Sequence, residues 1–161
     1  MAEGRSGSSL ALWAAAVLGT VHAAWSLYWA LGGTVLLETV GQWAVQASEE
    51  TPVRAAVVLM LVTVAKLAGA WIPLLAEGER IPWRKLWRIL AWIAGPALIL
   101  YGGADLVAGT AVLLGLLDAH VSDSAALIGH AFIWGPLFAL WGVALTTGLI
   151  LTRRRPKHSR R

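Results

Sequence analysis

Four ionisable side chains stand inside the long apolar stretches of this 161-residue chain. They are His22, Lys66, Asp105 and His130, one in each stretch. A charged group at mid-bilayer depth costs roughly 2.5 to 3.5 kcal/mol on insertion scales, so each of them needs a partner or a wet cavity. Histidine, aspartate and lysine can also move protons for a bound substrate. These four residues are therefore the candidate catalytic groups, and acid–base chemistry is what they would do.

The stretches that carry these residues predict four membrane-spanning helices. Apolar residues make up 58% of the chain and charged residues 14%, whereas a soluble domain is about 45 to 50% apolar. About 20 apolar residues cross a hydrocarbon core of about 30 Å. We expect an all-α bundle with helices at about 10–31, 53–75, 89–113 and 126–151. The expected division is one domain, 1–152, followed by a basic tail, 153–161.

The basic residues predict how such a bundle is oriented. With four crossings, one side holds nearly all of them, and the other side holds five acidic residues and only Arg54. The positive-inside rule then places both termini in the cytoplasm of a bacterium, with the protein multi-pass in its inner membrane. Topology accounts for the basic tail, so we expect contact with anionic lipid there and no nucleic-acid partner. The residues on the inner side are Arg5, Arg80, Arg84, Lys85, Arg88 and those of the tail.

Several kinds of site are excluded because the chain has no cysteine. Disulfides, thiol catalysis and cysteine-based zinc or iron–sulfur centres are ruled out. We expect no metal and no cofactor, because His22 and His130 are offset by roughly 8 Å in depth, which makes a shared haem iron awkward. The first apolar stretch is too long for a signal peptide and is expected to stay as the first helix.

The connection between the first two helices has amphipathic spacing. Its apolar residues alternate with Glu38, Gln42 and Gln46 at helical intervals, which favours a short helix lying on the outer membrane surface. Such a helix could cover a cavity, and a plain interfacial loop is the alternative. The apolar residues are Leu36, Leu37, Val40, Trp43 and Ala44.

The polar groups of the spans share helix faces with small residues. In the third span Gly95, Gly102 and Gly109 lie on the stripe of Asp105, and such stripes let helices approach closely in lipid. Counting residues along the spans places Lys66 and Asp105 at depths in the membrane where their side chains can meet. We therefore predict them as the strongest pair. It would be either a functional pair or a buried salt bridge that only sets helix register. In the last span Gly135-Pro136 interrupts the helix beside His130, as a site or as a packing kink.

Aromatic residues at deep positions are the candidate ligand-binding residues. If they line the bundle, they form an aromatic cavity with a few acid and base groups, which is the general form of a small-molecule site. The alternative is that they face lipid. The candidates are Trp25, Tyr28, Trp29, Tyr101 and Trp134.

Two segments carry a resemblance to other proteins. Residues 22–33 read HAAWSLYWALGG and residues 130–142 read HAFIWGPLFALWG. In these segments, and in its layout of four apolar stretches, the chain resembles a family of small four-helix membrane proteins of unknown function from high-GC bacteria. The resemblance implies the four-helix architecture, and it brings neither an established activity nor accepted catalytic residues.

Three functions remain open on this sequence. The first is a membrane protein that binds or transforms a lipophilic small molecule by acid–base chemistry in an aromatic cavity, and whether it is an enzyme stays undecided. The second is a proton-coupled transporter or ion pathway through His22, Lys66 and Asp105. The third is a structural or accessory subunit whose polar groups join the helices. A homo-oligomer is compatible with all three. We rank ligand binding first, because many aromatic residues accompany few charges.

Overall fold

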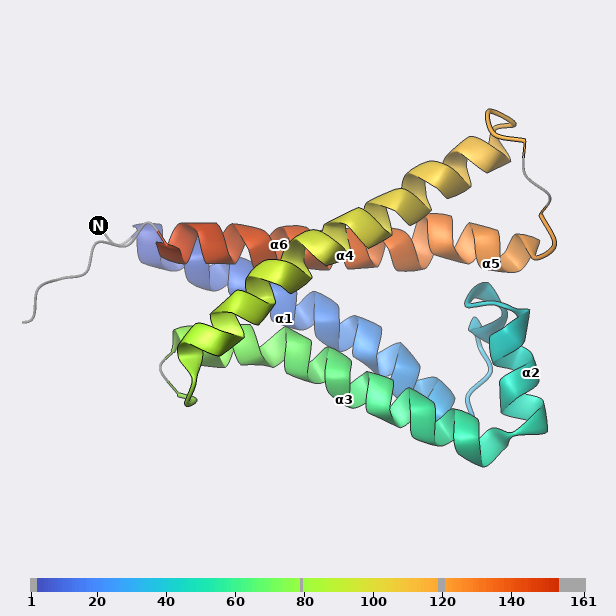
Figure 1. Cartoon of the computed structure of the whole chain (residues 1–161), viewed down its shortest axis with the longest axis horizontal. Helices are drawn as coiled ribbons and strands as arrows, with labels where there is room; N and C mark the ends of the chain where they lie inside the picture. Colours follow the sequence, from blue (N-terminus) through green and yellow to red (C-terminus); the bar gives the residue numbers. More distant parts are fainter. Residues whose placement is uncertain (1–2, 79, 119–120, 154–161) are drawn as a thin grey trace, which may run out of the picture.

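The computed structural model describes residues 3–78, 80–118 and 121–153 of the chain, with side chains from residue 9 onward. All regular structure in these residues is helical (Figure 1). The basic tail predicted for 153–161 lies outside the described residues, apart from Arg153. The elements are α1 (Glu3–Ala30), the 3₁₀ turn η1 (Leu37–Thr39), α2 (Gln42–Glu50), α3 (Pro52–Glu77), α4 (Arg84–Leu113), α5 (Ser124–Gly129), the π-helical turn η2 (His130–Trp134) and α6 (Gly135–Arg153).

Four helical segments are long and apolar enough to cross a membrane. They are Ser9–Ala30, Pro52–Glu77, Arg84–Leu113 and Ser124–Arg153. The four predicted helices are thereby confirmed as helices, with most ends within two residues of those expected. The exceptions are α1, which begins at Glu3 instead of about residue 10, and α4, which begins at Arg84 instead of about residue 89.

The helix ends follow local sequence signals. Gly32, with φ of 91°, closes α1: the N–H of Gly33 donates to the carbonyl of Tyr28 and that of Gly32 to Trp29. This is the glycine-dependent Schellman end of a helix. Pro52 occupies the first turn of α3, where its missing N–H costs no hydrogen bond. The end of α1 and the start of α3 therefore follow from a glycine and a proline in the sequence.

The last long segment contains a π turn next to a proline. The N–H of Gly135 donates to the carbonyl of His130, five residues earlier, and Pro136 follows with no N–H to give. One extra residue in the turn rotates His130 and Trp134 relative to a regular helix, and such turns occur often at functional sites. The irregularity expected at Gly135-Pro136 is thus present, and it includes the predicted site residue His130.

Small residues bring α4 and α6 into close contact. A Cβ on Gly102 would collide with the carbonyl of Gly135 and lie 2.6 Å from the backbone nitrogen of Ala139. A Cβ on Gly109 would lie 2.7 Å from that of Ala131. The predicted glycine face of the third span is confirmed, because it packs backbone against backbone. The other main helix contacts are α1 with α3 and α1 with α6.

The connection after α1 forms a cover over one end of the bundle. We call residues 37–50, which comprise η1 and α2, the lid; Figure 1 shows α2 at the end of the molecule that also carries α5. Leu37 and Ala44 of the lid are buried in a cluster with Trp29 and Trp134. A short helix is present in this connection, as expected, but it begins only after Gly41, whose φ of 137° suits only glycine. Leu36, Leu37 and Val40 of the expected stripe therefore lie outside it.

Candidate functional site

Lys66 lies where α3 faces α1. Its ammonium nitrogen is 3.0 Å from Nδ1 of His22 and donates to the hydroxyl of Ser26 at 2.8 Å. His22 and Ser26 are buried on α1, one turn apart, so one face of α1 presents both acceptors. The same nitrogen lies 5.7 Å from the ring centre of Phe138, which places it within cation–π range.

The predicted pair of Lys66 with Asp105 is wrong. In the described part of the chain, Lys66 contacts α1, whereas Asp105 lies 3.1 Å from Nδ1 of His130. The depth argument placed Lys66 and Asp105 at similar levels, but helix rotation decides which groups meet. The glycine face of α4 turns Asp105 toward η2, and α3 packs mainly on α1.

The contact with Lys66 constrains the protonation of His22. An ammonium group only donates, so Nδ1 of His22 must accept and the ring hydrogen must sit on Nε2. That Nε2 is buried and has no hydrogen-bond partner among the described residues. The ring instead packs on Phe138, with centroids 3.9 Å apart, and on Trp134 at 5.7 Å. The hydrogen-bonded chain that starts at Ser26 and Lys66 therefore ends at His22.

Asp105 and His130 form a second polar pair, which joins α4 to the lid. Nε2 of His130 lies 3.3 Å from the carbonyl of Val40, which can only accept, so Nε2 carries a hydrogen. Nδ1 faces the Asp105 carboxyl group at 3.1 Å. One proton must lie between these two side chains, either on the imidazole or on the acid. The pair therefore holds the lid against α4 through the carbonyl of Val40.

Two further contacts fix the lid to the last long segment. The indole N–H of Trp134 donates to both the carbonyl and the hydroxyl of Thr39, at 3.2 and 3.0 Å. Asp123 accepts the N–H of Gln42 at 2.8 Å and that of Ala126 at 3.0 Å. The backbone hydrogen bonds from Ala126 and then from Gln42 hold the pKa of Asp123 below its ordinary value.

Beneath the lid lies a cavity of about 420 Å³ between α1, α2 and α3. The α3 wall runs from Arg54 to Lys66 at steps of four residues, so Arg54, Val58 and Val62 share one face with Lys66. The α1 wall contributes Ser26 and Trp29. The remaining lining is Leu37, Val40, Trp43, Ala44, Ala47, Thr51, Ala55 and Leu59. This lidded cavity is apolar along its length, with one basic residue toward each end.

A second pocket, of about 540 Å³, opens between α3, α4 and α6. Lys66, Tyr101 and Phe138 line it together with apolar residues of the three helices. Lys66 therefore borders both pockets. The Tyr101 ring packs edge-on against Phe138 at 5.3 Å, although half of the tyrosine surface remains exposed.

The predicted site residues do not surround one cavity. Of the four candidate catalytic residues, only Lys66 lines the lidded cavity, and His22 lies directly behind it. Of the candidate ligand-binding residues, Trp29 lines the lidded cavity and Tyr101 the second pocket. Trp25 and Tyr28 line a separate hollow on the outside of α1. Trp134 is buried beneath the lid with a structural hydrogen bond.

Sequence reasoning missed two residues of the lidded cavity. From the sequence, Trp43 was expected only as one of the apolar residues of the amphipathic connection, and Arg54 was noted only as a basic residue on the outer side. Arg54 did carry a signal, because it is the one basic residue on its side and lies twelve residues, or three steps of four, before Lys66. Trp43 carried none, because only the fold of the lid brings it to the lining of the cavity, where 67% of its surface stays exposed.

Comparisons with known proteins give one match. The model of one protein family, described as a protein of unknown function (DUF3995), matches residues 9–145. The matched region includes the lid, both polar pairs and all of the lidded cavity. No curated protein matches the chain. No solved structure matches it either.

Proposed function

We propose that this chain, which belongs to the DUF3995 family, is an integral membrane protein that binds an elongated lipophilic anion in the lidded cavity. The anionic group of the ligand would contact Lys66 and Ser26. Its apolar body would extend between α1 and α3 toward Arg54 and the lid. This proposal keeps the ligand-binding interpretation of the sequence and assigns Lys66 as the residue that selects for charge.

One observation carries the proposal: Lys66 has no acidic partner among the described residues. Its polar contacts are His22 and Ser26, and neither can neutralise an ammonium charge. Lys66 lies fourteen residues into α3, roughly 21 Å along a helix of 26 residues. A lone ammonium at that depth is costly, and an anion beside it removes most of the cost.

The shape of the cavity supports an elongated ligand. Arg54 and Lys66 are separated by roughly 18 Å along α3 at 1.5 Å per residue. Trp29 and Trp43 supply flat apolar surface between them. Such a site buries an apolar body and recognises one polar end, which is the usual composition of a small-molecule pocket.

The alternative of a proton pathway receives less support. A relay needs a continuous series of donors and acceptors, but Nε2 of His22 faces aromatic rings and has no partner in the part of the chain that the structure describes. The Asp105–His130 pair belongs to a different contact, with the carbonyl of Val40. The two pairs thus act separately, one at the cavity and one at the lid.

We further propose that both termini face the cytoplasm of a bacterial inner membrane. Arg80, Arg84, Lys85 and Arg88 gather at the turn between α3 and α4, at the end opposite the lid (Figure 1). Cysteines introduced at Ser48 and Ser122 should react with an impermeant reagent on intact cells, and one at Ser159 should not. Reaction at Ser159 would reverse the orientation.

The binding proposal is tested by comparing an acid with its neutral analogue. The probes are a pyrene-labelled long-chain carboxylate and the matching alcohol, each corrected for its own measured partitioning into empty detergent micelles, and only the carboxylate can neutralise Lys66. The wild-type protein should bind the carboxylate more tightly, and Lys66→Met should lose roughly 30-fold of that preference. Lys66→Arg should retain it, since the charge remains.

Val64→Ala, on the exposed face of α3, is the matched control and should behave as wild type. Circular dichroism and gel filtration establish that each variant is folded. Equal binding of acid and alcohol by folded wild-type protein would refute the proposal, as would a preference that survives in folded Lys66→Met.

A further inference from the structure

We propose a second site on this protein, at the end opposite the lid, which binds the phosphate headgroup of an anionic phospholipid. The site is a pocket of about 630 Å³ lined by Lys85, Arg88, Ile89, Trp92, Ile93 and Arg153. It shares no residue with the lidded cavity. It depends on the membrane location proposed above, but not on any ligand beneath the lid.

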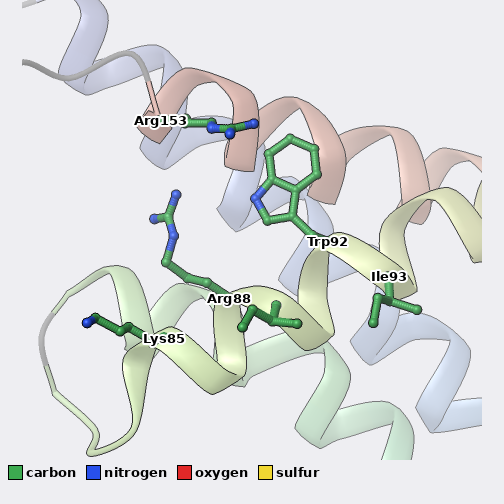
Figure 2. Close-up of a pocket in the computed structure, with 6 residues that line it drawn as sticks. Lys85, Arg88, Trp92, Ile93 and Arg153 are labelled. Atoms are coloured by element: carbon green, nitrogen blue, oxygen red, sulfur yellow. The ribbon is translucent and has the colours of Figure 1, made fainter.

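Two helices far apart in the sequence build this basic pocket. On α4, Lys85, Arg88 and Trp92 recur at helical spacing, and Arg153 comes from the last residue of α6. Figure 2 shows the Arg88 and Arg153 side chains beside the Trp92 indole, with Lys85 on the far side of Arg88. The Arg153 guanidinium lies 5.8 Å from the Trp92 ring centre, so the ring holds this cation in place.

Two of the three cations in the basic pocket are not paired with a protein acid among the described residues. Arg88 donates to the Glu77 carboxylate at 2.6 Å, which fixes its guanidinium group. Neither Lys85 nor Arg153 has an acidic partner among the residues that the structure describes. The pocket therefore keeps a net positive charge next to an ordered arginine, and arginine and lysine together suit a phosphate.

The apolar half of the pocket favours a lipid over a free phosphate. Ile89 and Ile93 are exposed on α4, one and two helical turns further along the span than Lys85. An acyl chain lying on these residues would be continuous with the bilayer, while its headgroup met the three cations at the surface. Basic pockets between helices at this level are typical phospholipid headgroup sites.

Native mass spectrometry of detergent-solubilised protein tests the lipid site. The probes are phosphatidylglycerol and phosphatidylcholine of identical acyl chains, added at equal concentration. The wild-type protein should retain phosphatidylglycerol preferentially, and Lys85→Gln and Arg153→Gln should each reduce that retention about five-fold, from about 1 kcal/mol per cation. Arg80→Gln removes the same charge at the same end but outside the pocket, and it should change retention less than two-fold.

Three further measurements separate lipid binding from unfolding of a variant and from binding of free phosphate. Brominated phosphatidylglycerol should quench tryptophan fluorescence more in the wild type than in Trp92→Phe, which locates the acyl chain. Arg153→Lys should keep the preference if the loss in Arg153→Gln is due to charge and not to unfolding. Inorganic phosphate at millimolar concentration should not displace the lipid.

Three outcomes would overturn the lipid site. They are no preference for phosphatidylglycerol in the wild type, an equal loss in Arg80→Gln, and displacement by inorganic phosphate. Failure of the carboxylate to bind beneath the lid leaves these measurements unaffected, because none of the altered residues lines that cavity. Conversely, Lys66→Met should retain phosphatidylglycerol as the wild type does.

Discussion

The ammonium nitrogen of Lys66 lies 3.0 Å from Nδ1 of His22, while Asp105 is paired with His130. Lys66 and Asp105 are therefore held by two different histidines. Each histidine joins a pair of elements: His22 joins α1 to α3, and His130 joins α4 to the lid through Val40. This arrangement leaves the charge of Lys66 available to a ligand and assigns the Asp105–His130 pair to the lid.

Because Lys66 contacts His22 and not Asp105, the structure predicts which pairs of substitutions are energetically coupled. In a double-mutant cycle, His22→Ala and Lys66→Met should couple by roughly 0.5 to 3 kcal/mol, because their side chains are in contact. Lys66→Met and Asp105→Leu share no hydrogen-bond partner, so their effects should add within about 0.5 kcal/mol. The measurement is the free energy of unfolding in mixed detergent micelles. Strong coupling between Lys66 and Asp105 would contradict the structure.

Neighbouring glycines on α4 give a sharp test of helix packing. Gly102→Ala should destabilise the protein by roughly 1 to 3 kcal/mol, since the added methyl group meets the backbone of Gly135 and Ala139. Gly103→Ala meets no atom within 4 Å and should be neutral or stabilise by up to about 1 kcal/mol through helix propensity. Thermal unfolding in detergent compares the two. Equal losses would show that α4 and α6 do not meet at Gly102.

The attachment of the lid to the last long segment can be tested by comparing substitutions of two tryptophans. Trp134→Phe removes the indole donor to Thr39 and should speed amide exchange over residues 42–50 by roughly 2- to 10-fold, the equivalent of one hydrogen bond. Trp141→Phe is the matched control, because the Trp141 indole nitrogen is buried without a partner among the described residues. Hydrogen exchange by mass spectrometry reports on the lid directly. Faster exchange in Trp141→Phe but not in Trp134→Phe would mean that contacts other than the Trp134–Thr39 hydrogen bond hold the lid.

The hydrogen bonds of the Asp123 carboxylate to Gln42 and Ala126 predict that the stability of the lid's attachment depends on pH. Its folded-state pKa is depressed by the N–H groups of Ala126 and Gln42, so its contribution to stability is complete above the unfolded value of 3.8. The contribution is lost as the pH falls through the lower, folded pKa. Asp123→Ala should lower the melting temperature by a few degrees at pH 6.

The difference in melting temperature between Asp123→Ala and the wild type should shrink as the pH is lowered below about 3.8. Asp118→Ala removes the same charge from the same connection and is the control. A difference that stays constant from pH 6 to pH 3 would mean that the carboxylate does not cap α5 in solution.

The sequence by itself determined the four long helices and the glycine face of α4. These features are local: about 20 apolar residues favour a helix wherever they lie, and glycines spaced by seven share one face of it. The spacing of Leu37, Val40 and Ala44 predicted a short helix in the lid, although of these residues only Ala44 lies in α2. Lys66 and Trp29 were recognised as candidates because a polar or aromatic residue in an apolar span is unusual without a partner or a site.

Only the tertiary structure decided which of these residues meet. Depth along a span follows from counting residues, but the rotation of each helix about its axis follows from packing against its neighbours, and no single span encodes that. The glycine contacts of α4 with α6 turn Asp105 toward His130, and the packing of α3 on α1 turns Lys66 toward His22. The lidded cavity likewise depends on distant contacts, since Trp134 and His130 hold a lid that lies about 90 residues earlier in the chain.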